Sequence, residues 1–167
     1  MEVSIRKAVA EDARQIRDVH LASIEGLGSQ GYTEEQVAVW AHDRDPEEYP
    51  IESQDTYFLV AENNTAVIGF GWMKSDAGDH FETDVEGEIT AIYIHPSVAR
   101  QGIGSRIYAE LEAQAVRQNI DSLGLWASRN AVPFYEAQGY NRVTDHAHEY
   151  HDEITLLLVE MEKQAIR

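Results

Sequence analysis

The stretch "EITAIYIHPSVARQGIGSRIYAELEAQA", residues 88–115, joins three predicted elements. Residues 88–94 are an apolar run typical of a buried strand, and a loop containing Gly102 and Gly104 follows. The spacing of apolar residues then predicts an amphipathic helix over about 102–118. Glycines before a helix let the backbone approach a ligand, and the first helical N–H groups attract anions. The stretch therefore predicts an anion-binding loop between a strand and a helix.

Three patterns compete for this loop. A Walker loop, G-x-x-x-x-G-K-[ST], is excluded because no lysine follows Gly104. A dinucleotide fingerprint, G-x-G-x-x-G, lacks its third glycine in 102–107, and no βαβ unit follows. The remaining pattern is a cradle in which the N–H groups of 100–105 bind a pyrophosphate. A helix start with glycine for packing stays open as the alternative.

Composition limits the class of protein. The chain has 167 residues, of which 43% are hydrophobic, so we expect a single domain over 1–167. The lack of cysteine excludes disulfides, thiolate nucleophiles and cysteine-bound metal. Residues 1–15 lack the apolar core of a signal peptide, and no run approaches the length of a membrane span. A soluble, cytoplasmic protein is expected.

The chain is strongly acidic: 30 acidic and 13 basic residues give a net charge of −17, and its lysines are Lys7, Lys74 and Lys163. Such a surface repels nucleic acid and anionic membranes, so neither is expected as a partner. It would attract a cationic amine. A general solubility adaptation, as in high salt, is the favoured explanation because the acids are spread along the whole chain.

Predicted strands and helices alternate along the chain, which places it in the α+β (mixed α/β) class. Thr33 and Gln36 have the spacing of a capping box, and "NN" at 63–64 is a hairpin signal. Gly26 and Gly139 are predicted to end two helices. Strands are predicted at 3–8, 56–62, 65–74, 88–94, 123–128 and twice within 140–163, and helices within 10–26, 33–43, 102–118 and 130–139.

The segments "IYIHPSVARQGIGSRIY" and "SRNAVPFYEAQGY" resemble the GCN5-related N-acetyltransferase (GNAT) superfamily, and the resemblance covers nearly the whole chain. Gly102 and Gly104 match the family signature Q/R-x-x-G-x-G/A. Ala99 stands where Gln or Arg is usual, and the basic residue follows as Arg100. The resemblance implies a central, mostly antiparallel sheet of six to seven strands, flanked by about four helices.

The resemblance also implies acetyl-coenzyme A as co-substrate and a primary amine as acceptor, with direct transfer in a ternary complex. The amine would belong to a small molecule, a peptide N-terminus or a protein lysine, and 20–55 and 140–153 would select it. The implied cofactor contacts are backbone groups of Ile92, Tyr93 and Ile94 for the pantetheine arm, Arg100, Gln101, Gly102, Ile103, Gly104 and Ser105 for the pyrophosphate, and Asn130.

Two residues are candidates for proton transfer. Tyr135, in "FYEAQGY", is similar to the family's acid tyrosine, and a phenol can protonate a leaving thiolate. Glu88, at the start of a predicted strand, resembles the base glutamate of histone-acetylating members and would act directly or through water. A core tyrosine and an exposed strand-start acid are the structural alternatives.

Histidine and tryptophan residues are further candidates for the site. His146 and His148 share a strand face, so a metal is conceivable, but a polar hairpin is favoured because no third ligand has fixed spacing, and no metal is expected. Trp40 and Trp72 are candidate walls of the acceptor pocket, whereas Trp126 is expected in the core.

Alternatives remain for function and assembly. A non-catalytic acyl-coenzyme A binding or sensor module would keep the cradle and lack the chemistry. Transfer of another acyl group, such as succinyl, is less favoured because it needs a basic pocket residue. Many family members dimerise, so a homodimer is open; "ITLLLVEME", residues 154–162, would serve it as an edge strand or else lie centrally in the sheet.

Overall fold

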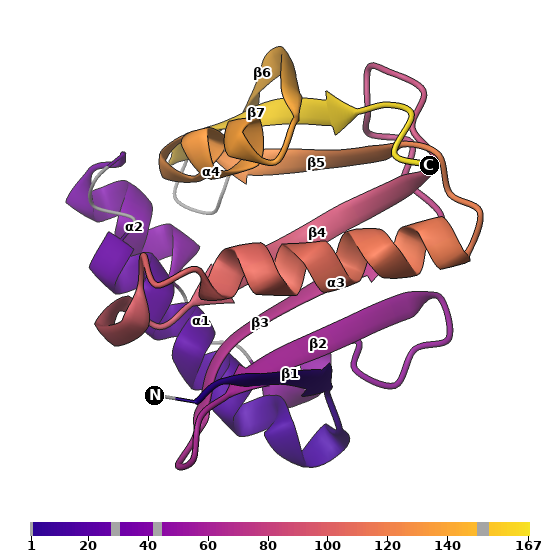
Figure 1. Ribbon diagram of the computed structural model, residues 1–167. Helices are drawn as coiled ribbons and strands as arrows, with labels where there is room; N and C mark the ends of the chain where they lie inside the picture. The colour runs from indigo at the N-terminus through magenta and orange to yellow at the C-terminus, as the bar shows by residue number, and fades with distance from the viewer. Residues whose placement is uncertain (1, 28–30, 42–44, 150–153) are drawn as a thin grey trace.

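The computed structural model describes residues 2–27, 31–41, 45–149 and 154–167. These residues form a seven-stranded sheet in the order β1-β2-β3-β4-β5-β7-β6 (Figure 1). The strands are β1 Ser4–Lys7, β2 Thr56–Glu62, β3 Val67–Lys74, β4 Gly87–Ile94, β5 Leu123–Ser128, β6 Asn141–Glu149 and β7 Thr155–Lys163. The α-helices are α1 Ala13–Leu27, α2 Glu34–Trp40, α3 Ile103–Arg117 and α4 Val132–Ala137, with short 3₁₀ turns η1 Ala10–Asp12, η3 Pro46–Glu48, η4 Pro96–Val98 and η5 Arg129–Ala131.

The predicted mixed fold is confirmed, with seven strands and four α-helices in the described ranges. Neighbouring strands pair antiparallel except β4 and β5, which are parallel. The segment "ITLLLVEME" contributes β7, which pairs with β5 on one side and β6 on the other. It is therefore an interior strand, and the edges of the sheet are β1 and β6.

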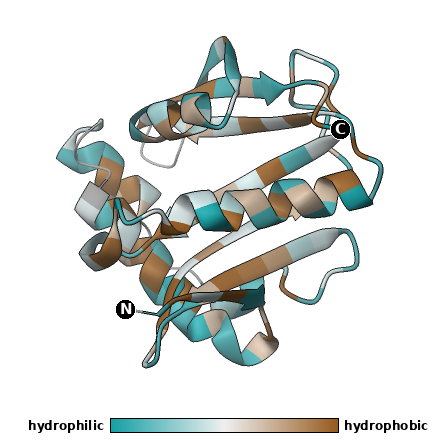
Figure 2. Ribbon diagram, in the orientation of Figure 1, coloured by the Kyte–Doolittle hydropathy of each residue, from teal (hydrophilic) through white to brown (hydrophobic). Residues whose placement is uncertain are grey.

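Helices cover both faces of the sheet. On β2, Leu59 belongs to the apolar cluster that includes Ile107 and Leu111 of α3, whereas Phe58 belongs to the cluster of Ile16 on α1. This alternation along a strand buries both faces, as a sheet between two helical layers requires. In Figure 2, α3 alternates hydrophobic and hydrophilic residues, as expected of a helix with one buried side. None of the helices in the described ranges is long and apolar enough to span a membrane.

Several local predictions are confirmed. The Gln36 N–H donates to Thr33 Oγ1 at 3.2 Å and Gln36 Oε1 accepts from the Thr33 N–H at 2.9 Å, which completes the capping box of α2. The β2–β3 hairpin turns at Asn63. The end of α1 differs from prediction, since the helix runs through Gly26. A Cβ there would lie 2.5 Å from Pro96 Cγ, so this glycine permits close packing of α1 against η4.

The sheet opens between β4 and β5. These strands pair only at Gly87↔Leu123 and Glu88↔Gly124, although each runs on for several residues. The β3–β4 register shifts here, with Thr90 as the extra residue of a bulge on β4. A bulge bends its strand, which accounts for the divergence from β5. Beyond Glu88, the β4 edge that faces β5 pairs with no strand in the described part of the chain.

Arg6 connects β1 to η1 and β2 through hydrogen bonds to two carboxylates. Its guanidinium donates to both carboxylate oxygens of Asp12, at 2.9 and 3.0 Å, and to those of Glu62, at 2.9 and 3.1 Å. The buried Asp12 carboxylate also accepts the N–H of Val9 at 2.8 Å. The hydrogen bonds from Arg6 are the main reason that the pKa of Asp12 is lowered from 3.8.

We expect Asp12→Asn to lower the free energy of unfolding by about 1.5–3 kcal/mol at pH 7, because charge-assisted hydrogen bonds are lost. The pKa of Asp12 is lower in the folded state than in the unfolded state. The ionised carboxylate therefore adds fully to the free energy of unfolding above the unfolded-state pKa, and this stabilisation is lost as the pH falls through the folded-state pKa. Urea denaturation should therefore show the difference narrowing below pH 3.8. Asp18→Asn, at an exposed position, is the control; a gap that stays constant with pH would contradict the account.

Candidate active site

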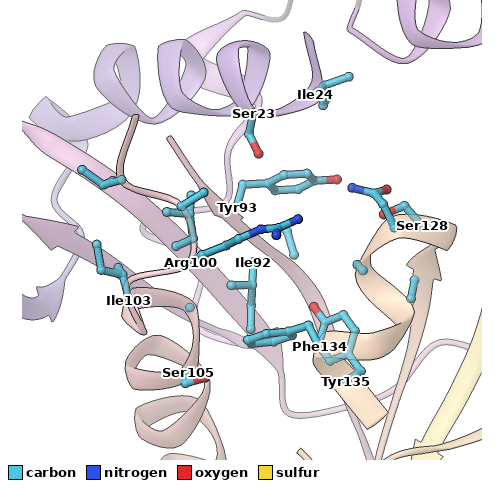
Figure 3. Close-up of a pocket in the computed structure, with 18 of the residues that line it drawn as sticks. Ser23, Ile24, Ile92, Tyr93, Arg100, Ile103, Ser105, Ser128, Phe134 and Tyr135 are labelled. Carbon is cyan, nitrogen blue, oxygen red and sulfur yellow. The ribbon is translucent and has the colours of Figure 1, made fainter. Parts of the chain in front are cut away.

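A pocket of about 310 Å³ lies where β4 and β5 separate. It is lined by α1 and α2 through Ser23, Ile24 and Trp40, by 90–94 of β4, by the glycine loop, and by the segment from β5 to α4. Figure 3 shows Ser23 and Ile24 on one side of it and Phe134 and Tyr135 on the other. Because its walls come from both helical layers, the pocket extends through the sheet at the opening.

The predicted cofactor residues gather at this pocket: all except Gln101 line it. Ile92, Tyr93 and Ile94 pair with β3 on one side of β4 and lie beyond the last β4–β5 pair on the other, and Asn130 belongs to η5. In Figure 3 the side chains of Tyr93 and Arg100 extend into the pocket from the β4 side. Segments that are separated in the sequence thus line one cavity.

The glycine loop has the geometry of an anion site. Arg100 and Gly102 both have left-handed backbone angles, with φ of 64° and 84°. Gly102 is the N-cap of α3 and supplies no capping side chain. Within the described part of the chain, the N–H groups of 103–105 in the first turn have no acceptor. A Cβ on Gly102 would meet nothing within 4 Å, so open space borders these donors. Such N–H groups bind phosphate oxygens well.

Tyr135 lines the pocket from α4. The residue is 6% exposed, and its ring contacts those of Phe134 and Tyr140. Among the described residues, its hydroxyl forms no hydrogen bond. Burial is the main cause that raises its pKa, followed by the nearby hydroxyls of Tyr140 and Tyr93. The hydroxyl therefore keeps its proton throughout the neutral range.

Glu88 does not line the pocket. One carboxylate oxygen accepts the N–H of Gly78 at 3.2 Å, and the other lies 3.4 Å from Nε2 of His80. The residue is 7% exposed, whereas the His80 side chain is 41% exposed. The structure therefore separates the two predicted proton-transfer residues: Tyr135 faces the cavity, and Glu88 lies beneath the loop that precedes β4.

The tryptophans differ partly from expectation. Trp40 lines the pocket as expected, but Trp72 instead stacks on Phe58 with ring centroids 4.7 Å apart. Trp126, which was expected in the core, lines the pocket. No pattern in the sequence marks Thr90, a residue of the β4 bulge that also lines the pocket. Side chains alternate between the two faces of a strand, so Trp126 points to the opposite face of β5 from the core residues Leu125 and Ala127. This alternation is the one sequence signal that could have predicted its position.

His146 belongs to a buried pair next to the pocket. Its Nε2 lies 2.7 Å from Oε1 of Glu160, a residue of β7 with 0% exposure. Its ring stacks on Trp126 with centroids 4.0 Å apart. Glu160 also accepts the N–H of Glu82, so this carboxylate and Glu88 both hold the loop over residues 75–86. In the described ranges, no three His, Cys, Asp or Glu side chains gather as a metal site.

Comparisons with known proteins assign the family. Residues 29–165 match the model of the acetyltransferase (GNAT) domain, so the chain belongs to the GNAT acetyltransferase family. An uncharacterized N-acetyltransferase of Archaeoglobus fulgidus is 25% identical over 147 residues, covering 84% of this chain and 94% of that protein.

Solved structures show the same fold. A GCN5-related N-acetyltransferase from Rhodopseudomonas palustris superimposes with a TM-score of 0.83 at 25% identity, over 98% of this chain and 96% of that one. The PaiA N-acetyltransferase of Thermoplasma acidophilum, solved with coenzyme A, has a TM-score of 0.71 at 22% identity, over 98% and 99% of the two chains. The predicted family and enzyme class are confirmed.

Proposed function

We propose that residues 1–167 form one domain that transfers the acetyl group of acetyl-coenzyme A to a primary amine, directly and in a ternary complex. One observation carries the proposal: a single pocket joins the anion-binding start of α3, the unpaired edge of β4 and the Tyr135 hydroxyl. The similarity to PaiA, which was solved with coenzyme A, supports the choice of co-substrate.

The residues present fit this co-substrate. The free N–H groups of 103–105 and the side chain of Arg100 would bind its pyrophosphate. The free backbone groups on the edge of 92–94 would pair with the amides of the pantetheine arm, as an added strand does. Asn130 would hold the arm from the opposite side. Bound in this way, the co-substrate supplies an activated acetyl group at the opening of the sheet.

Glu88 and Tyr135 then transfer the protons of the reaction. Glu88 accepts the proton that the ammonium group must lose, through water or through His80, a more exposed side chain whose Nε2 lies 3.4 Å from this carboxylate. The amine nitrogen forms a bond to the carbonyl carbon, and the carbon–sulfur bond breaks. Tyr135 gives its proton to the departing sulfur, and the second proton that the nitrogen loses as the amide forms restores the Tyr135 hydroxyl. No covalent enzyme intermediate is needed, which agrees with a chain that lacks cysteine.

Tyr135→Phe tests the enzyme against the non-catalytic binding module. We expect kcat to fall about 10²–10⁴-fold, because the general acid is removed, with an unchanged dissociation constant for acetyl-coenzyme A. Steady-state kinetics and calorimetric titration measure the two quantities. Tyr57→Phe is the control, since Tyr57 lies on β2, outside the pocket lining. A wild-type chain that binds the co-substrate but acetylates no amine would support the sensor module instead.

Glu88→Gln tests the base. We expect kcat/KM to fall about 100-fold, because the amide cannot accept the ammonium proton. Glu160→Gln is the matched control, since Glu160 also anchors the 75–86 loop through a backbone N–H but is not proposed to transfer protons. That control should lower the melting temperature and keep most of the activity. Equal losses of kcat/KM in the two variants would assign Glu88 to loop anchoring alone.

Gly102→Ala tests the cradle. The new methyl group would enter the open space beside the N–H donors, and we expect the dissociation constant of acetyl-coenzyme A to rise at least about tenfold. Gly139→Ala is the control because Gly139 also has a positive φ, 98°, and lies outside the pocket lining. Both changes should cost about 1–2 kcal/mol of stability. Equal affinities in the two variants would show that Gly102 only starts the helix.

A further inference from the structure

A buried tyrosine outside the pocket lining joins three elements that surround the pocket. Tyr32 lies just before α2 and is 7% exposed. Its hydroxyl donates to the carbonyl oxygen of Leu157 at 2.7 Å and accepts the N–H of Arg129 at 2.9 Å. Burial is the main cause that raises the pKa of this phenol from 10.0, so the hydroxyl keeps its proton and can donate and accept at once. One oxygen atom thus connects the start of α2, strand β7 and the turn η5.

The Tyr32 hydroxyl lies where β7 runs past the end of β5. The last residue of β5 pairs with Leu158, and β7 extends beyond this pair to Thr155. In that extension the carbonyl oxygen of Leu157 accepts from Tyr32, and that of Thr155 accepts from the side-chain amide of Gln36 at 2.8 Å. The carbonyls of alternate residues lie on the same edge of a strand. Two side chains therefore bind this edge of β7 where its strand partner has ended.

The junction at Tyr32 also contacts two residues that line the pocket. Asn130 follows Arg129 in η5 and lines the pocket. A Cβ on Gly31 would lie 3.5 Å from the backbone nitrogen of Asn130, so the chain before Tyr32 packs directly on this residue. The ring of Tyr32 meets that of Trp40 edge-on, with centroids 5.4 Å apart. The junction thus connects one lining residue of η5 with one of α2.

The side chain of Arg129 strengthens the same junction. Its guanidinium lies over the ring of Tyr32, 4.9 Å from the centroid, and donates to the carbonyl oxygen of Gly31. Neither Tyr32 nor Arg129 lines the pocket. Any effect of these two residues on a ligand in the pocket must therefore pass through the turn that carries Asn130.

Resting on the proposed function, we infer that Tyr32 is a positioning residue for the pantetheine arm of acetyl-coenzyme A. Its hydroxyl holds η5 where Asn130 meets the arm, and α4 with Tyr135 follows directly from this turn. Without the hydroxyl, η5 loses its hydrogen-bonded link to β7 and α2. The glycine loop at 100–105 comes from another part of the chain and keeps its geometry. Loss of the hydroxyl therefore weakens the contacts of the arm and leaves those of the pyrophosphate.

Tyr32→Phe tests this role, because it removes the hydroxyl and keeps the ring that contacts Trp40. Calorimetric titration gives the dissociation constants of acetyl-coenzyme A and of ADP, which has the pyrophosphate and no pantetheine arm. We expect the constant of acetyl-coenzyme A to rise at least about fivefold and that of ADP to change less than about twofold. A general loosening of the fold would not select between the two ligands.

Two control variants separate positioning from loss of stability. Asp12→Asn destabilises the fold from outside the pocket lining and should leave both dissociation constants unchanged. Gln36→Glu keeps an acceptor for the N–H of Thr33 but cannot donate to β7, so it loosens α2 without removing the link to η5. It should leave the dissociation constant of acetyl-coenzyme A within about twofold of the wild-type value.

Arg129→Met provides a second variant if Tyr32→Phe does not fold. The Arg129 side chain is exposed, and the change removes its charge from the Tyr32 ring and its donor to Gly31 while the Arg129 N–H remains. We expect a rise of about two- to fivefold in the dissociation constant of acetyl-coenzyme A and no change for ADP.

Each remaining outcome counts against a stated part of the account. An unchanged constant for acetyl-coenzyme A in folded Tyr32→Phe, or in Arg129→Met if the first variant does not fold, overturns the inference and leaves the proposed acetyl transfer intact. Equal losses for acetyl-coenzyme A and ADP, or an equal loss in Gln36→Glu, also overturn it, because Tyr32 would then support the fold alone. A wild-type chain that does not bind acetyl-coenzyme A overturns the proposed function itself, and the inference with it.

Discussion

The short parallel pairing of β4 and β5 is the constraint on which the site depends. Two residue pairs join the strands, and the bulge at Thr90 then turns β4 away. Continued pairing would fill the opening with backbone hydrogen bonds and remove the cavity. Because the strands part, one edge of β4 keeps free backbone groups, and the pocket reaches both faces of the sheet. The fold thereby places the start of α3, the Tyr135 hydroxyl and the helices α1 and α2 around one space.

The carboxylates near the opening also have a structural role. Glu88 and Glu160 hold the 75–86 loop against the sheet through the N–H groups of Gly78 and Glu82. Trp126 lies between the two anchors, with the His80 ring edge-on at 5.3 Å and the His146 ring stacked at 4.0 Å. The two carboxylates near the opening, Glu88 and Glu160, are therefore paired with groups of the protein itself. The net charge of −17 is therefore no direct guide to the charge of the substrate.

The parts of the structure that depend on neighbouring residues could be predicted from sequence. The Thr33 capping box, the turn at Asn63 and the glycine loop before α3 each need only a few adjacent residues. Tyr135 was found through a motif, and the fold placed it in the pocket. The interior position of β7 could not be read from its own residues, because strand order is set by distant pairings.

Long-range contacts also explain the remaining differences. Trp126 faces the pocket because β5 separates from β4, which its local sequence does not reveal. Gly78 and His80 enclose Glu88 from a segment without regular structure, and no periodicity predicts where such a segment lies. The pairing of His146 with Glu160 joins residues on two strands, so the spacing of histidines alone could not show that a carboxylate of β7 is its partner.

The most direct test of the central claim is amide hydrogen exchange with and without acetyl-coenzyme A. If the co-substrate binds in the opening, exchange should slow at 90–94 on the free edge of β4 and at 100–105 in the loop, because those N–H groups gain acceptors or lose access to water. The strands β1 and β2, on the far side of the sheet, should exchange as before. Protection confined to other segments, or none at saturating acetyl-coenzyme A, would contradict the account.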